Sequence, residues 1–170
     1  MAERQAPMDC IPLHRAPTSL QAMIRSVVSL MEPYAEPLRI ELKIMLDPGL
    51  PETITVDEDK IAWALGMLIG NALRHVERGS FFHPGGEITV HAGTRQETRD
   101  VIIEVSDTGP GIPPDLLPLL FQPAPYQRRI GYAVILGREI MLAHGGTMDV
   151  ESTQDPINHG TTVRIVLPGH

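Results

Sequence analysis

The chain has 170 residues, of which 42% are hydrophobic and 21% are charged, and its formal net charge is −7. This length and composition predict one globular domain with a buried core and exclude a disordered chain. The negative charge argues against a general surface for nucleic acid or an anionic membrane, so any polyanion must be bound locally.

Cys10 is the only cysteine, which excludes an internal disulfide and a thiolate metal site. The longest uncharged apolar run, residues 61–73, is too short to cross a bilayer, and the polar start does not resemble a secretory signal. We therefore expect a cytoplasmic setting without membrane insertion. The only lysines, Lys43 and Lys60, are both followed by Ile, which excludes a Walker-type phosphate loop.

Residues 1–17 are polar and broken by prolines, so we expect an N-terminal arm or the remnant of a linker there. The domain is expected to cover residues 18–170. A capping box of the form T-x-x-Q at Thr18 predicts a helix that runs to about Met31 and ends before Pro33.

Alternating and β-branched patterns predict strands at residues 38–46, 53–56, 87–92, 101–107, 147–151 and 161–167. Helical spacing predicts a regular helix capped by Asp57, a short helix opened by residues 113–115, and an apolar helix over 132–144. This order predicts an α/β two-layer sandwich, with one mixed, mostly antiparallel sheet and helices on one face.

The helix after Asp57 carries polar groups beside its apolar stripe. Residues Met67, Asn71, Arg74, His75 and Arg78 follow one another at helical spacing, so we expect them to face the same way. An isolated Asn in a helix is usually solvated. An Asn one turn before a basic cluster is a better candidate for holding a metal-bound polyphosphate.

A β-branched run beginning at Val101 ends at a carboxylate and breaks into the turn Asp107-x-Gly109-x-Gly111-Ile112. The glycines allow a ligand to approach the backbone, and an ionised Asp at the strand end can accept hydrogen bonds from an amine such as that of adenine. The alternative is an Asx turn that ends a surface strand. The turn alone does not decide between them.

Several motifs in this order resemble those of the ATP-binding catalytic domain of bacterial histidine kinases. The fold is shared with DNA gyrase, heat-shock chaperones and mismatch-repair ATPases. Residues 65–75 resemble the N box, 107–112 the first glycine box and 120–123 the F box, while 143–146 and 160–168 complete a pattern that begins near Thr18.

This resemblance implies ATP or ADP and Mg²⁺ as cofactors. Asn71 would supply its amide oxygen to Mg²⁺, Arg74 and also His75 would neutralise phosphate charge, Asp107 would hold the adenine amine, and Thr161 or Thr162 would support the base. Arg74 is thus the one residue with a predicted catalytic role. The other predicted nucleotide-binding residues are Gly109, Gly111, Ile112, Gly131, Tyr132, Ala133 and Val134.

The chain departs from the family in the second glycine box, where residues 129–134 keep only Gly131 of three glycines. Arg128 or Arg129 would compensate at the γ-phosphate, or they are solvated loop charges. Met67 occupies the position where the ATPase relatives carry a Glu base. No general base is identified, so we do not expect hydrolytic activity.

None of the histidines is followed by Asp or Glu, so the family's phosphoacceptor motif is absent from this chain. The leading hypothesis is the catalytic domain of a two-component sensor histidine kinase, with a His on a separate dimerisation or phosphotransfer domain as acceptor, within a response-regulator pathway. The alternatives are a nucleotide-responsive protein-interaction module and a stand-alone serine kinase of the anti-sigma type.

Overall fold

The computed structural model describes residues 11–121 and 131–169, with only the backbone of 131–133. Its elements are β1 (Ala16–Thr18), α1 (Leu20–Ala35), η1 (Glu36–Leu38), β2 (Glu41–Leu46), β3 (Ile54–Val56), α2 (Glu58–His75), β4 (Glu87–Thr94), β5 (Val101–Asp107), η2 (Leu117–Leu119), α3 (Gly131–Ala143), β6 (Thr147–Thr153) and β7 (Gly160–Leu167). The predicted strands and long helices are present with shifted ends, and the short helix predicted after residue 113 is the 3₁₀ turn η2.

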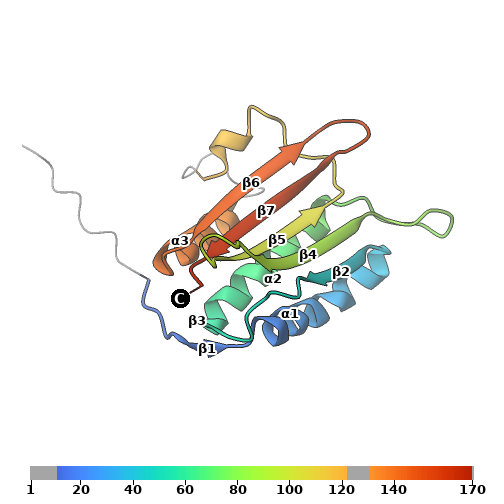
Figure 1. Ribbon diagram of the computed structural model, residues 1–170. Coiled ribbons are helices and arrows are strands. Elements are labelled where there is room, and N and C mark those ends of the chain that lie inside the picture. Colours follow the sequence, from blue (N-terminus) through green and yellow to red (C-terminus); the bar gives the residue numbers. More distant parts are fainter. Residues whose placement is uncertain (1–10, 122–130, 170) are drawn as a thin grey trace, which may run out of the picture.

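Five strands form one sheet in the order β2-β4-β5-β7-β6. Strand β2 runs parallel to β4, and the other neighbouring strands are antiparallel. The connection between the parallel strands passes through β3 and α2, since parallel neighbours need a crossover. The three α-helices lie together on one side of the sheet (Figure 1). The mixed two-layer fold predicted from the sequence is therefore confirmed.

The N-terminal boundary differs from the prediction. Strand β1 pairs antiparallel with β3, so ordered structure crosses the boundary expected at residue 17. Helix α1 is capped by Ser19, whose hydroxyl accepts from the Ala22 N–H, and it continues through Pro33 to Ala35. The capping residue predicted at Thr18 lies instead in β1, because the strand pairing holds Thr18 extended.

The core lies between the helices and the inner face of the sheet. The buried stripe of α2 follows helical spacing, and alternate residues of β4, β5 and β7 point toward it. The fully buried large side chains of these elements are Ile61, Leu65, Ile69, Ile88, Val90, Val101, Ile103, Ile165 and Leu167. The same alternation decides which polar residues of these strands face the helices.

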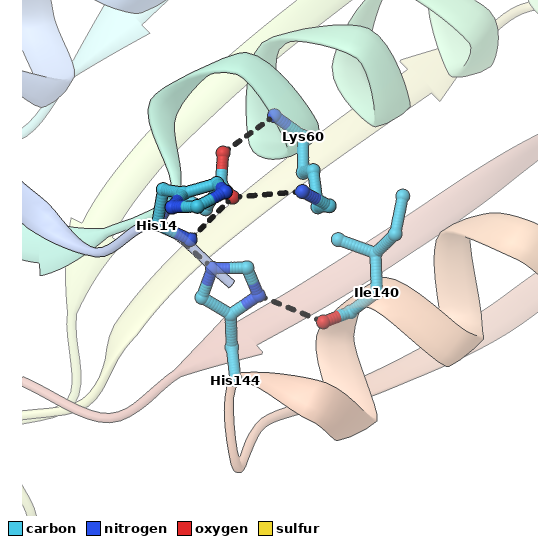
Figure 2. Close-up of polar contacts among 5 residues, drawn as sticks. His14, Lys60, Ile140 and His144 are labelled. Atoms are coloured by element: carbon cyan, nitrogen blue, oxygen red, sulfur yellow. Dashed lines mark hydrogen bonds and ion pairs between the residues drawn. The ribbon is translucent and has the colours of Figure 1, made fainter. Parts of the chain in front are cut away.

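A buried polar cluster ties the N-terminal end of α2 to the end of α3 (Figure 2). The Asp57 side chain, which caps α2, accepts hydrogen bonds from the His14 N–H at 2.9 Å and from Lys60 Nζ at 2.9 Å. His144 Nδ1 donates to the Ile140 carbonyl at 2.8 Å, so its Nε2 accepts from the Asp57 N–H at 3.0 Å. We call these contacts the Asp57 cluster.

Asp57 is 3% exposed, and the partners of its carboxylate come from the chain itself. The hydrogen bond from the His14 N–H, with those from Lys60, lowers the pKa of Asp57 to about 2. Since these bonds are stronger to the ionised form, the cluster stabilises the fold most while Asp57 is charged.

None of the helices in the described part of the chain combines the length and the apolar character that a membrane span requires.

Candidate functional site

A pocket lies at the C-terminal end of α2, between this helix and the end of β5. Its empty volume, including the open mouth, is about 750 Å³. The lining is mostly apolar and comes from α2, β5, the segment after β5 as far as Leu120, α3, and strands β6 and β7. The lining residues are Leu68, Asn71, Ala72, His75, Val105, Asp107, Pro110, Gly111, Ile112, Pro113, Leu120, Val134, Val150, Thr161 and Val163. The few polar groups are those singled out in the sequence.

Asp107 is the last residue of β5 and lines the pocket. Burial raises the pKa of its carboxyl group, although hydrogen bonds from the Gly109 and Thr161 backbone amides and the charge of His75 act against this. The Gly109 N–H donates to Asp107 Oδ1 at 2.9 Å. The side chain therefore forms the Asx-type turn of the alternative interpretation, and in addition it presents a poorly solvated carboxylate to a cavity.

Backbone shape explains the glycine at position 111. Gly111 has φ +80°, and a Cβ there would collide with the Thr153 carbonyl of β6. The next residue, Ile112, donates its N–H to Ser152 Oγ at 2.7 Å. The turn is thus packed directly against β6, and Gly111 and Ile112 line the pocket.

A second hydrogen bond fixes the turn from the β6–β7 connection. His159 Nδ1 donates to the Gly109 carbonyl at 2.6 Å. Gly109 itself does not line the pocket, but both its backbone groups are used, the N–H by Asp107 and the carbonyl by His159. Ser152 and His159 hold the turn from opposite ends of this connection.

Sequence reasoning missed both of these residues. His159 was interpreted only as a loop, cap or surface histidine, and Ser152 lies just beyond the strand predicted at residues 147–151. Both bonds join residues 40 or more positions apart, and no local pattern signals such a contact. The position of His159 directly before Gly160 was the one available signal.

Helix α2 supplies Asn71 and His75, which are one turn apart and both line the pocket. The Asn71 side-chain nitrogen is buried and has no hydrogen-bond partner among the described residues. A buried polar atom without a partner is costly, so a bound ligand or water would be expected to satisfy it.

The expectation that Met67, Arg74 and Arg78 share this orientation is wrong for this structure. All three line a different concavity, between α1 and α2. At about 100° per residue, Met67 and Arg74 lie to one side of Asn71 and His75 lies to the other. The part of α2 that lines the pocket therefore meets the part that lines the α1–α2 concavity close to Asn71. The predicted phosphate contact of Arg74 therefore requires its side chain to turn.

Strand alternation distinguishes the two threonines. Thr161 pairs with Asp107 and lines the pocket. Thr162 points to the opposite face of the sheet, where its hydroxyl lies 2.9 Å from Ser106 Oγ. Of the two residues considered for support of a base, Thr161 is the one in position.

The start of α3 completes the wall with Val134, which is buried. Gly131, Tyr132 and Ala133 are the first residues of α3, and only their backbone is described. Arg128 and Arg129 also lie outside the described residues.

No cluster of three or more His, Cys, Asp or Glu side chains suited to a metal ion occurs within residues 11–121 and 131–169. A divalent cation in this pocket would therefore take one protein ligand at most from Asn71 and complete its shell with ligand oxygens and water. Mg²⁺ tolerates this arrangement, since it favours hard oxygen donors and keeps several waters. The donor set fits Mg²⁺ bound with a polyphosphate.

Residues 56–170 match the family described as histidine kinase-, DNA gyrase B-, and HSP90-like ATPase. The chain is 30% identical over 169 residues to the sensory histidine kinase/phosphatase NtrB of Rhizobium meliloti (strain 1021), covering 92% of this chain and 42% of the relative. The chain thus spans less than half the length of this relative.

Solved structures share the fold. Full-length ShkA in complex with AMPPNP matches with a TM-score of 0.77 and 26% identity, over 94% of this chain and 32% of that one. Histidine kinase ThkA, solved in complex with the response regulator protein TrrA, matches with a TM-score of 0.73 and 23% identity, over 93% of this chain and 42% of that one.

Proposed function

Because this chain belongs to the histidine kinase-, DNA gyrase B- and HSP90-like ATPase family, we propose that it binds Mg²⁺-ATP or ADP and donates the γ-phosphate to a His on a separate domain or chain. It is a catalytic ATPase domain of the type found in sensor histidine kinases. The nucleotide, the metal and the acceptor are the parts that we propose.

One observation carries the proposal: the Asp107 carboxylate and the Asn71 amide, whose nitrogen has no hydrogen-bond partner among the described residues, line the same pocket. The Asp107 carboxylate would accept the adenine amine, and Thr161 lies beside it for a hydroxyl or water contact. Asn71 lines the same pocket from α2, where its amide oxygen would contact Mg²⁺ and its nitrogen a phosphate oxygen. Between them the apolar lining suits an aromatic base.

The chemistry expected of the chain is alignment and charge stabilisation. The bond from the γ-phosphorus to the β,γ-bridging oxygen breaks, a bond to a nitrogen of the acceptor imidazole forms, and ADP leaves. Bound Mg²⁺ supplies charge neutralisation on the phosphates. His75 lines the pocket, and Arg74 would join it by turning from the α1–α2 side. Met67 provides no base for water, which favours transfer over hydrolysis.

Two half-site variants test the binding mode by calorimetry. Asp107→Asn removes the charged acceptor on the base side, whereas Asn71→Ala removes the metal ligand on the phosphate side. Mg²⁺ should strengthen ADP binding by the unmodified chain and by Asp107→Asn, but not by Asn71→Ala. Absence of ATP and ADP binding to the unmodified chain in Mg²⁺ would refute the proposal.

The acceptor is identified by incubation with γ-labelled ATP and an isolated His-containing dimerisation domain. Acid-labile label on that domain, absent with Asn71→Ala, is the expected result. Acid-stable label on a protein acceptor would instead indicate the serine-kinase alternative. Tight nucleotide binding without transfer would indicate an interaction module, which the reduced second glycine box favours.

A further inference from the structure

A second concavity lies between helices α1 and α2, apart from the nucleotide pocket. Its walls carry large side chains that remain accessible: Leu30 is 72% exposed and Tyr34 66% on α1, and Trp63 is 43% exposed on α2. Aromatic side chains and methionine are enriched at protein interfaces, and Met67 also lines this groove. We call this concavity the α1–α2 groove.

Two glycines of α2, Gly66 and Gly70, also line the groove one turn apart. A Cβ on Gly66 would lie 3.8 Å from a Val27 methyl carbon, and one on Gly70 would lie 3.7 Å from Met31 Cε. Both are ordinary contact distances, so packing of α1 against α2 does not require glycine. Glycine destabilises a helix interior relative to alanine. The two glycines thus leave space that the domain's own packing does not use.

Charged residues mark the two ends of the groove. Asp59 lies near the start of α2, and Arg74 and Arg78 lie at and beyond its end. Within the described residues, none of these three side chains has a hydrogen bond or ion pair. From Asp59 to Arg74 the helix rises about 22 Å, which is the length of a helix of about fifteen residues.

We propose that the α1–α2 groove docks an amphipathic helix of a partner protein or domain. The partner helix would place apolar side chains over Gly66 and Gly70, acidic residues beside Arg78, and a basic residue beside Asp59. Since acidic residues favour the N-terminal turn of a helix and basic residues the C-terminal turn, the partner helix runs antiparallel to α2. A second copy of this chain is disfavoured because each copy carries a net charge of −7.

Trp63 is the only tryptophan of the chain and lines the groove, so its fluorescence reports occupancy directly. The probe is a synthetic helical peptide of about sixteen residues, with leucines at helical spacing, glutamates in its first turn and lysines in its last. A matched peptide carries the same residues with the charged ends exchanged. The first peptide should shift Trp63 emission to shorter wavelength and bind about fivefold more tightly than the second.

Two variants locate the binding. Gly66→Leu fills the floor of the groove and should abolish the peptide-induced shift. Arg78→Glu should remove the preference between the two peptides. Leu30→Glu, at an exposed position of α1, gives a second way to block the groove without touching the core. Thermal unfolding of each variant checks that the domain still folds.

Equal binding of both peptides, or binding that survives both Gly66→Leu and Leu30→Glu, would overturn the proposal, as would no shift at all. A Trp63 shift that depends on protein concentration without peptide would assign the groove to a second copy instead. The test needs no nucleotide, so its outcome is independent of the proposed kinase function.

Discussion

Two aspartates near opposite ends of α2 differ in role: one stabilises the fold, and the other lines the candidate binding pocket. Asp57 caps the start of α2 and is 3% exposed, and bonds from His14 and Lys60 lower its pKa to about 2. Asp107 lies beyond the other end of α2 and lines a pocket, and burial raises its pKa. Both carboxylates are poorly solvated, but only Asp57 receives full compensation from the chain.

The difference teaches what a ligand-facing carboxylate costs the protein. A carboxylate whose hydrogen-bond donors come from the chain contributes to folding stability. A desolvated carboxylate with too few such donors is instead available to bind a donor group of a ligand. The Asn71 side-chain nitrogen, which lines the same pocket and has no partner in the described part of the chain, follows the same logic. We therefore expect substitutions at the two aspartates to affect different measurements.

The largest expected effect is on nucleotide affinity in Asp107→Asn. Loss of the charged acceptor should weaken ADP binding about ten- to hundredfold, as measured by calorimetry. Because burial already disfavours the charge of Asp107, the free energy of unfolding should not fall. A variant that unfolds more easily while binding ADP normally would reverse the roles that we assign.

Asp57→Ala should affect stability instead. The loss of a helix cap and of hydrogen bonds to a charged group should lower the free energy of unfolding by about 2–4 kcal/mol, as measured by urea denaturation. Asp57 and His75 are separated along α2 by about 27 Å, so the ADP affinity of the folded fraction should stay within about twofold. A large loss of affinity at unchanged stability would break the comparison.

Acidification should separate the two aspartates without any mutation. Asp57 stabilises the fold fully above its ordinary pKa of 3.8, and this contribution is lost as the pH falls from there toward about 2. Asp107 has a raised pKa, so its ionised form is lost at higher pH than in an ordinary Asp, and ADP affinity then falls by up to about tenfold per pH unit. Binding should therefore disappear before the fold.

The pH experiment follows ADP affinity by calorimetry and folding by circular dichroism on the same samples. Asp107→Asn is the matched control, because titration of the nucleotide itself affects both proteins and cancels in the ratio of their affinities. A constant ratio across the acid range would contradict the assignment of the titration to Asp107.

The smallest expected effect concerns the support of the glycine turn. Ser152→Ala leaves the Ile112 N–H without its acceptor and should weaken ADP binding about fivefold. Ser106→Ala is the matched control, since its hydroxyl bonds Thr162 on the opposite face of the sheet. Equal losses in both variants would mean that the effect is general destabilisation.

The sequence predicted the fold because its signals are local. Helical spacing located α2, β-branched runs located β5, and Asp57 was correctly identified as the cap of α2. The exceptions are equally physical. Pro33 was expected to end a helix but lies inside α1, and Thr18 was expected to cap that helix but pairs in β1.

Sequence patterns predicted a site residue only where a single helix or strand determines which way its side chain points. Asp107 and Asn71 follow from the end of a strand and from a helical stripe, and both line the pocket. The helical spacing of α2 did not distinguish Arg74 from His75, because the pocket and the α1–α2 groove lie on adjacent sides of this helix. The turn's supports, Ser152 of β6 and His159 of the β6–β7 connection, are distant in sequence and carry no local pattern.

The sequence by itself determined the elements, their order and the chemical types at the site, since hydrophobic period, caps and turns act over a few residues. Only the tertiary structure decided which flank of α2 faces the pocket, which threonine of β7 does so, and which aspartate is satisfied by the chain. These depend on packing between elements, where small rotations of a helix or the alternation of a strand change the neighbours of every side chain.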